Sequence, residues 1–128
     1  MTPVVHLPEE LRHQILDHCL AALPDEGCGM LAMDGDRVVR VYPTGNDDAS
    51  PVSYTVPPQE HFEALTDAES HGWHLGGVFH SHPHGPARMS GTDLARAVEP
   101  SWIYLVIDLG GEKPVITAWE NGRSVSLE

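Results

Sequence analysis

The chain has 128 residues, which is enough for one compact domain and too few for two of ordinary size. It carries 19 Asp and Glu against 7 Lys and Arg, a formal net charge of −12, together with 9 His. This charge argues against nucleic acid and against an anionic membrane surface as partners, because both attract clusters of Lys and Arg. No apolar run approaches the roughly 20 residues that a transmembrane helix needs. The 2 cysteines do not form the disulfide framework of a secreted domain, so we expect a cytoplasmic protein whose residues 1–128 form a single domain.

Hydrophobic spacing and turn residues divide the chain into helices and strands. In chain order we expect a strand at 4–7, a helix at 8–23, strands at 27–33, 37–42 and 53–56, a helix at 57–71, a strand at 73–82, a helix at 90–98, and strands at 102–109, 115–119 and 123–127. Pro24 ends the first helix, whose apolar stripe includes Cys19, Leu20 and Leu23, so we interpret Cys19 as a small buried residue. The second helix is expected to bury Phe62 together with Leu65 and Ala68.

The turns and the most apolar segment indicate how the strands are arranged. Asp34-Gly35-Asp36 and Asn121-Gly122 are typical of tight hairpin turns. The strand at 102–109 is the most apolar, so we expect it at the centre of the sheet. The tryptophans are expected in the core: Trp73, Trp102 and Trp119. The sequence therefore predicts a mixed α/β (α+β) domain with a curved, mostly antiparallel sheet and about three helices.

The segment from 76 to 93 contains residues that suit a metal site. His80 and His82 are two positions apart in a strand, so their side chains point to the same face and can converge on one ion. Asp93, in the first turn of the next helix, supplies a third ligand and leaves one tetrahedral position open, as in catalytic zinc sites. A structural alternative remains open. The histidines could bond to backbone groups at the strand end, and Ser90 with Asp93 could form only a helix capping box.

The same segment resembles a known signature. His80-Ser-His82-Pro83, followed after six residues by Ser90-Gly-Thr-Asp93, is similar to the motif of the JAMM (MPN+) metallopeptidases. Upstream, Pro24-Asp-Glu26-Gly-Cys28-Gly-Met-Leu resembles the Pro-x-Glu-x-Cys-Gly-x-Leu segment of small prokaryotic members. The resemblance covers nearly the whole chain, in length, order of elements and both motif segments.

The resemblance implies a single MPN/JAMM domain that acts as a zinc metallopeptidase. His80, His82 and Asp93 would hold one Zn²⁺ per chain with a catalytic water, whose pKa the metal lowers to about 7. Glu26 would be the general base and Ser90 would stabilise the oxyanion. Family members cleave an amide or isopeptide bond after the C-terminal diglycine tail of a ubiquitin-like or sulfur-carrier protein, so we expect such a partner. Without the resemblance, Glu26 is simply an acid in a loop.

Other residues near the motif have simpler interpretations. Cys28 could offer a thiolate to zinc, but we favour a small buried residue. His84 is expected in solvent or beside substrate, and Arg88 is a candidate contact for a carboxylate of the substrate. His74 is either a neighbour of the metal ligands or a plain strand residue. The remaining histidines are expected at the surface: His6, His13, His18, His61 and His71.

The motifs of the chain separate the metallopeptidase from rival functions. The signature of the zinc deaminases and the His-Glu-x-x-His of the common metalloproteases are both absent from the chain. A catalytically silent scaffold of the same fold lacks metal ligands, and this chain keeps them. A JAMM-type peptidase that acts on a cell-wall or other small peptide stays open as an alternative.

Overall fold

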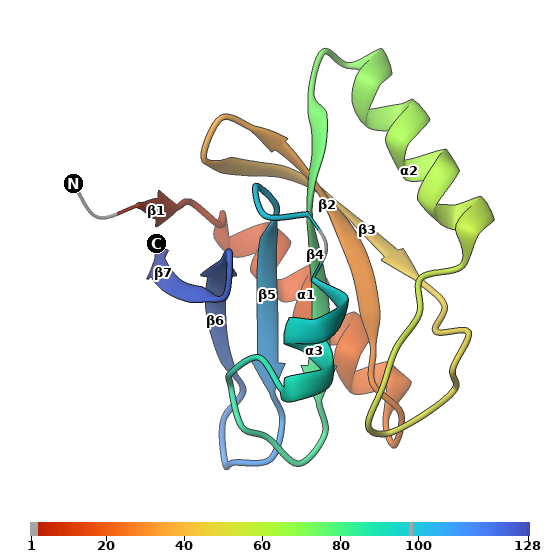
Figure 1. Cartoon of the computed structure of the whole chain (residues 1–128), viewed down its shortest axis with the longest axis vertical. Coiled ribbons are helices and arrows are strands. Elements are labelled where there is room, and N and C mark those ends of the chain that lie inside the picture. The colour runs from red at the N-terminus through yellow and green to blue at the C-terminus, as the bar shows by residue number, and fades with distance from the viewer. Residues whose placement is uncertain (1–2, 98) are drawn as a thin grey trace.

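Apart from the predicted strand at 53–56, the elements of the protein follow the predicted order. The computed structural model describes residues 3–97 and 99–128, and the predicted end of the third helix at Val98 lies outside the described residues. The helices are α1 (Glu9–Ala22), α2 (Pro58–Ser70) and α3 (Gly91–Arg96). The strands are β1 (Val4–Val5), β2 (Cys28–Asp34), β3 (Arg37–Thr44), β4 (His74–His82), β5 (Ile103–Asp108), β6 (Val115–Glu120) and β7 (Arg123–Leu127) (Figure 1). In the part of the chain that is described, no helix is long and apolar enough to span a bilayer.

One seven-stranded sheet joins the strands in the order β1-β7-β6-β5-β4-β2-β3. The pairs β4–β5 and β1–β7 are parallel, and the other neighbouring pairs are antiparallel. β5 stands in the middle of this order, with an almost entirely buried sequence, which confirms its predicted central position. The predicted mixed, mostly antiparallel α/β fold with three helices is therefore confirmed.

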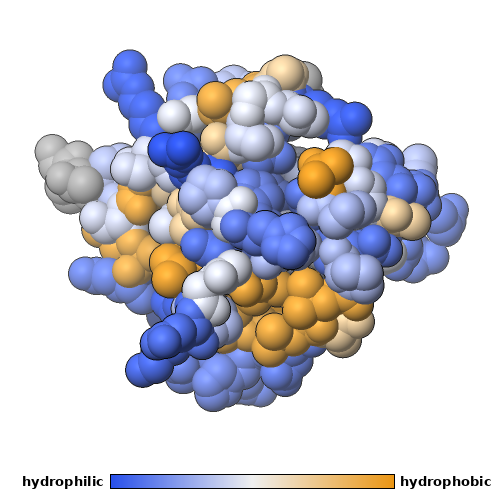
Figure 2. Space-filling model, turned by 90° about the horizontal axis from the view of Figure 1, so that it is seen from below, coloured by the Kyte–Doolittle hydropathy of each residue, from blue (hydrophilic) through white to orange (hydrophobic). Residues whose placement is uncertain are grey.

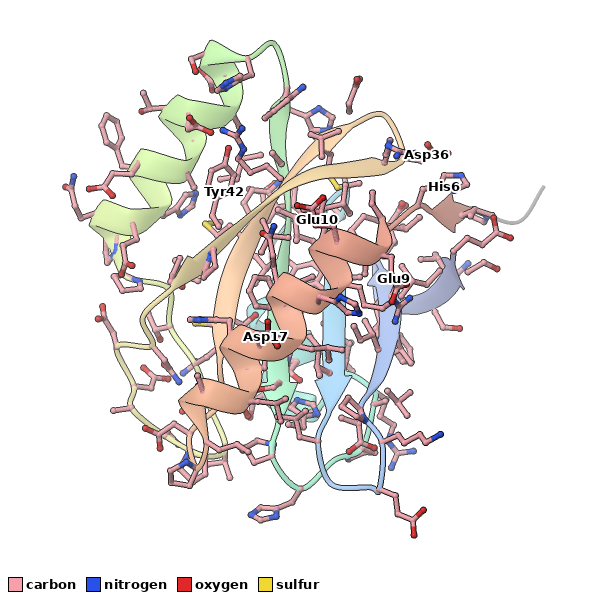
Figure 3. The ribbon with its side chains drawn as sticks, turned by 180° about the vertical axis from the view of Figure 1, so that it is seen from behind. His6, Glu9, Glu10, Asp17, Asp36 and Tyr42 are labelled. Atoms are coloured by element: carbon pink, nitrogen blue, oxygen red, sulfur yellow. The ribbon has the colours of Figure 1, made fainter. Side chains whose placement is uncertain are left out.

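The two ends of the sheet approach one another, so the sheet is curved. Just after β1, His6 forms an isolated parallel bridge with Arg37 at the start of β3. The N–H of Val38 donates to the His6 carbonyl at 2.9 Å, and the N–H of His6 donates to the Asp36 carbonyl at 2.9 Å. Figure 3 shows His6 and Asp36 side by side at this closure. The backbone groups at both sheet edges are thus partly satisfied by each other.

Helices cover both faces of the curved sheet. α1 crosses one face (Figure 3), where Ile15 and Cys19 are fully buried against a cluster that includes Phe79. This confirms the interpretation of Cys19 as a small buried residue. α2 and α3 lie on the other side (Figure 1), where Ala64 joins a second cluster with Val106. Because side chains alternate along a strand, β4 contributes to both clusters and has its functional residues on the second face.

The predicted strand at 53–56 is wrong. These residues lie in the loop between β3 and α2, and they pair with no strand. The side chain of Asn46 takes the hydrogen bonds that a strand partner would otherwise supply: its amide N–H donates to the Ser53 carbonyl, and its carbonyl accepts from Thr55 N–H. Side-chain bonding of this kind stabilises loops at the expense of sheet ladders.

The burial of α2 also differs from the prediction. Ala64 and Ala68 are its buried residues, Leu65 is partly buried, and the side chain of Phe62 is 62% exposed. Small residues at i and i+4 allow the helix backbone to approach β4 closely, and Phe62 lies outside that narrow contact. The prediction that Phe62 belongs to the buried stripe is therefore wrong.

Several other apolar side chains are less buried than predicted. Figure 2 looks onto the end of the molecule where β4 ends and shows a broad apolar area on a mostly hydrophilic surface. Leu20 and Leu23, from the predicted stripe of the first helix, are 47% and 44% exposed. The three tryptophans are only partly buried, and Trp119 uses its indole N–H to donate to Thr117 Oγ1 at 2.9 Å. The last turn of α1 is thus covered less than its apolar spacing suggests.

Close packing at Gly29 gives a test of this architecture. A Cβ at Gly29 would collide with the Phe79 ring and the backbone carbonyl of Tyr42, because β2 is enclosed by β3 and β4. We expect Gly29→Ala to lower the free energy of unfolding by about 1–3 kcal/mol, measured by urea denaturation. Gly91→Ala is the matched control, since a Cβ there meets no atom within 4 Å. Equal stability of the two variants would contradict the packing described for β2.

Candidate metal and catalytic site

The end of β4 carries the two histidines of the motif. His80 and His82 are both buried, and they lie on the face of the sheet opposite α1. β2 and β5 flank β4 at this level, with Cys28 opposite His80 on one side and Val106 on the other. The histidine backbones are therefore fixed by hydrogen-bonded strands on both sides, which is a rigid support for ligands.

Asp93 completes a triangle of donor atoms with the histidines. Nε2 of His80 lies 3.0 Å from Nε2 of His82, and Oδ2 of Asp93 lies 3.1 Å from each of them. Ligand atoms about 2.0–2.1 Å from a tetrahedral zinc are roughly 3.3 Å apart, so the triangle is close to the spacing that such an ion requires. The structure thus brings together the three residues predicted as metal ligands.

The capping-box alternative for Ser90 and Asp93 is also present. The Asp93 N–H donates to Ser90 Oγ at 3.0 Å, and the Ser90 N–H donates to Asp93 Oδ2 at 2.8 Å. Burial of Asp93 favours its neutral form, but hydrogen bonds with His80 and His82 outweigh burial and hold the pKa of the carboxyl well below its usual range. The capping box is therefore compatible with metal binding by Asp93, because it orients an ionised carboxylate toward the histidines.

The second ring nitrogen differs between the two histidines. Nδ1 of His82 lies 2.7 Å from the Pro86 carbonyl and donates to it, so Nε2, which hydrogen-bonds to Asp93 here, is the nitrogen left for a metal, and a metal would replace its proton. Nδ1 of His80 is buried without a hydrogen-bond partner among the described residues. Burial lowers the pKa of His80, which keeps its imidazole neutral as a metal ligand must be.

Glu26 faces the same site from the segment before β2. Its side chain is 3% exposed, and its Oε1 has no hydrogen-bond partner among the described residues. One of its carboxylate oxygens lies within 4.8 Å of ring nitrogens of His80 and His82, which together form a group able to hold a metal ion. Burial raises the pKa of Glu26 from 4.5 to about 7, against the opposing effect of His82. The Glu26 carboxyl, which can gain or lose a proton near neutral pH, therefore lies beside the triangle of donor atoms from His80, His82 and Asp93.

Ser81 holds the Glu26 segment against β4. The Gly27 N–H donates to Ser81 Oγ at 2.9 Å, and the Ser81 N–H donates to the Gly27 carbonyl at 2.9 Å. The Glu26 N–H donates to the Ser50 carbonyl at 2.8 Å, and the Asn46 amide donates to the Glu26 carbonyl at 3.1 Å. Both backbone groups of Glu26 are thus fixed, which limits the positions its carboxylate can take.

A groove of about 530 Å³ runs beside this site. Its lining residues are Glu26, Pro51, Val52, His82, Pro83, His84, Gly85, Pro86, Arg88, Met89, Ser90 and Gly91. One wall comes from the β3–α2 loop and the other from the loop after β4. Thr117 on β6 fixes the second wall, because its hydroxyl donates to the Ala87 carbonyl at 2.7 Å. The groove opens on Glu26, so an extended chain lying in it would pass the proposed metal ligands.

The residues with open interpretations occupy distinct places. His84 and Arg88 are exposed and line the groove, in keeping with contact to solvent or substrate. Cys28 is fully buried, and its thiol donates to the Gly45 carbonyl at 3.1 Å. Burial raises the pKa of Cys28 to about 11, so it is the small buried residue that we favoured. His74 begins β4 and is exposed, far along the strand from His82, which makes it a plain strand residue.

Two residues near the site were not singled out correctly from the sequence. His18 was expected at the surface, but it is partly buried, and its Nε2 lies 3.0 Å from the Cys28 carbonyl and 2.9 Å from the Thr44 carbonyl. Tyr54 was placed in a strand, and its ring instead stacks on His80. Its position three residues before Pro57-Pro58 gave no signal, because stacking across distant segments has no local pattern.

A model of the prokaryotic homologues of the JAB domain matches residues 8–122 of this sequence. The chain belongs to this prokaryotic JAB family. The match includes the residues from Glu26 to Asp93 that form the candidate site. The resemblance to the JAMM/MPN proteins stated from the motifs is therefore confirmed.

Three relatives are similar over most of the chain. A desampylase of Haloferax volcanii is 36% identical over 112 residues, which cover 82% of this chain and 81% of that protein. A probable TtuB-protein conjugate cleaving protease of Thermus thermophilus is 38% identical over 96 residues, covering 73% and 64% of the two chains. A CysO-cysteine peptidase of Mycobacterium tuberculosis is 29% identical over 106 residues, covering 81% and 73%.

Two solved structures share the fold. The solution structure of protein DSY2949 from Desulfitobacterium hafniense matches with a TM-score of 0.87 and 38% identity, covering 97% of this chain and 91% of that one. A structure described as JAMM, a metalloprotease-like zinc site in the proteasome and signalosome, matches with a TM-score of 0.65 and 19% identity, covering 98% and 96%. The second likeness concerns the fold alone, and it supports the assignment of this architecture to the JAB/MPN class.

The raised pKa of Glu26 predicts a pH-dependent stability of the metal-free protein. Burial of the ionised Glu26 carboxylate lowers the free energy of unfolding. This loss of stability is absent below pH 4.5, where the carboxyl is protonated in both states, and is nearly complete above about pH 7. Glu26→Gln removes this loss of stability. In the presence of a chelator, we expect the variant to gain about 1–3 kcal/mol of unfolding free energy relative to the wild type between pH 5 and pH 8. Denaturant titrations at both pH values measure this change, and a difference that is independent of pH would contradict it.

Proposed function

We propose that this JAB-family protein is a zinc-dependent peptidase. It would hydrolyse the amide or isopeptide bond that follows the C-terminal diglycine tail of a ubiquitin-like or sulfur-carrier protein. The observation that carries this proposal is the buried Glu26 carboxylate, whose Oε1 is unpartnered among the described residues and which lies beside the triangle of His80, His82 and Asp93. A buried carboxyl without a partner is costly unless a ligand completes its surroundings.

The donor set suits zinc. Neutral imidazoles and a carboxylate are ligands that zinc accepts, and two histidines with one carboxylate leave a tetrahedral position open for a water or substrate. A zinc ion bound there would polarise the scissile carbonyl and lower the pKa of a coordinated water to about 7. His80, His82 and Asp93 are therefore assigned as its ligands, one ion per chain.

Glu26 is proposed as the general base and then the general acid. In the metal-free protein its pKa of about 7 lies close to neutral pH, where proton transfer in either direction is efficient. The carboxylate would take a proton from the attacking water and deliver it to the nitrogen of the leaving amine, which must be protonated as the C–N bond breaks. Fixed backbone bonds on both sides of Glu26 keep its carboxylate at one position during these transfers.

Ser90 is proposed as a donor to the developing oxyanion. Its Oγ accepts from the Asp93 N–H, which leaves the hydroxyl proton free to point into the groove that Ser90 lines. A fixed donor in this position stabilises negative charge on the carbonyl oxygen in the transition state. The helix cap thus holds Ser90 Oγ in place, and the hydroxyl proton of Ser90 can be donated to the carbonyl oxygen of the substrate.

The substrate class is inferred from the groove and the relatives. The groove is lined mostly by proline, glycine and apolar side chains, which suits an extended tail of small residues. The relatives named above are a desampylase, a probable TtuB-protein conjugate cleaving protease and a CysO-cysteine peptidase, and the last two names specify cleavage of a TtuB-protein conjugate and of CysO-cysteine. We therefore assign a carrier-protein tail to this groove.

Metal content tests the assigned ligands. Protein purified and reconstituted with zinc should contain about one zinc per chain, measured by elemental analysis after gel filtration. His82→Ala should lose most of this zinc, because removal of one of three ligands destroys the site. Glu26→Gln is the matched control: it should keep the zinc and lose at least about 10²-fold in turnover, since only proton transfer is removed. A wild type without zinc, or an active Glu26→Gln protein, would refute these roles.

The substrate class needs its own experiment. Carrier proteins extended beyond Gly-Gly, either by one amino acid or through a lysine side chain, should be cut after the second glycine when incubated with the zinc-loaded protein. Mass spectrometry of both products locates the cleaved bond. The matched substrate ends in Ala-Ala, whose methyl groups should hinder entry into the groove beside Glu26. If the protein cleaves unrelated small peptides but not these conjugates, the carrier protein is not its substrate and a small peptide is.

A further inference from the structure

The loop of residues 45–57, between β3 and α2, contacts three segments that form the candidate site. We call it the site loop. It bonds to the backbone of Glu26, it is tied to α3, which carries Asp93, and it places Tyr54 against His80. These contacts come from one continuous segment, so the position of the loop and the arrangement of the site are linked.

Asn46 determines the shape of the site loop. Its amide N–H groups donate to the carbonyls of Glu26 and Ser53, at 3.1 and 3.0 Å. Its side-chain carbonyl accepts from the N–H groups of Asp48 and Thr55, each at 3.0 Å. One side chain thus closes the loop on itself and joins it to the segment of the proposed base.

Arg96 fixes the middle of the site loop from α3. Its Nη1 donates to the Tyr54 carbonyl at 3.0 Å and lies 3.4 Å from Asp48 Oδ2. Arg96 is in the same short helix as Asp93, one turn further along. The backbone of Tyr54 is therefore held relative to the helix that supplies the third proposed ligand.

The ring of Tyr54 lies over the ring of His80. Their centroids are 4.4 Å apart and the planes are inclined by 20°, which is a stacked arrangement. His82 has its Nδ1 held by the Pro86 carbonyl, whereas Nδ1 of His80 has no hydrogen-bond partner among the described residues. Beyond the contacts of Nε2 with Asp93 and His82, the orientation of the His80 imidazole depends on packing, and Tyr54 supplies that packing on one face of the ring.

We propose that Tyr54 is a positioning residue that orients His80 by stacking and thereby raises the affinity of the site for zinc. This inference rests on the proposed function, because it assumes that His80 is a metal ligand. Metal-ligating histidines are normally oriented by a hydrogen bond from the second ring nitrogen, and here an aromatic face takes the place of that bond.

Stacking also favours the ligated form of His80 over the free form. A cation that draws electron density from the imidazole makes the ring more positive, and the negative face of the phenol ring attracts it more strongly. The contact is thus stronger when metal is bound than when it is absent. Such a difference between the two states is what changes a binding affinity, because equal stabilisation of both would cancel.

Zinc affinity measured by competition with a chromogenic chelator tests the proposal. Tyr54→Leu should weaken zinc binding by about tenfold or more, as for other residues that orient a metal ligand. Tyr54→Phe keeps the ring and should bind zinc within about twofold of the wild type, because the proposal needs the aromatic face rather than the hydroxyl. As a second readout, cobalt in place of zinc reports ligand geometry by its visible absorption, which should change only in Tyr54→Leu.

Tyr42→Leu is the matched control for general loosening. Tyr42 packs against the same apolar cluster as Tyr54, but its hydroxyl donates to Asp67 on α2 rather than contacting a proposed ligand. It should lose stability without losing zinc affinity. Arg96→Gln, at an exposed position, releases the Tyr54 backbone while leaving the ring intact, and it should weaken zinc binding even if Tyr54→Leu does not fold.

The outcomes separate this inference from the proposed function. If Tyr54→Leu and Arg96→Gln bind zinc as tightly as the wild type, the role of Tyr54 is overturned. The zinc site of the wild type then stays in place. Equal weakening in Tyr42→Leu and Tyr54→Leu also overturns it, since the effect would then be general. A wild type that binds no zinc overturns the proposed function and the inference together.

Discussion

The pairing of the segment before β2 with the end of β4 is the interaction on which the site depends. Ser81 makes this pairing specific, because its hydroxyl and its N–H both bond to Gly27. In a strand, Ser81 points to the face opposite that of its neighbours His80 and His82. The residue between the two histidines therefore clamps the Glu26 segment from one face and leaves the other face free for chemistry. The distance between the carboxylate and the imidazoles follows from sheet register, which is more rigid than a loop.

Burial gives the fixed groups the protonation states that a peptidase needs. Asp93 is held ionised by hydrogen bonds with the histidines, and burial keeps His80 neutral. Glu26 lacks such hydrogen bonds, since its Oε1 has no partner among the described residues, and burial therefore raises its pKa to about 7. Two carboxyl groups near the same imidazoles thus have opposite properties, one a permanent anion and the other a group that can exchange a proton. Neighbouring acids whose pKa values are shifted in opposite directions are typical of catalytic sites, where one acid stays ionised and the other transfers a proton.

Local patterns predicted most of the fold and failed where distant residues decide. Apolar runs and turn residues located seven strands and three helices, since these signals depend on near neighbours in the chain. The segment 53–56 has strand-like residues, but Asn46 takes its backbone bonds. Phe62 has helical spacing, yet α2 buries only its alanine side. Both errors arise from tertiary contacts that local spacing does not encode.

The sequence by itself determined which side chains could form a metal site, because spacing on a strand places two imidazoles on one face and a capping box places an acid at a helix start. The resemblance of both motif segments then indicated the family. Only the tertiary structure decided that Glu26 lies beside the histidines, that its carboxyl is buried without a partner among the described residues, and that Tyr54 stacks on His80. The physical reason is that periodicity is a local property of the chain. Proximity between remote segments and the loss of water around a charge are set by packing.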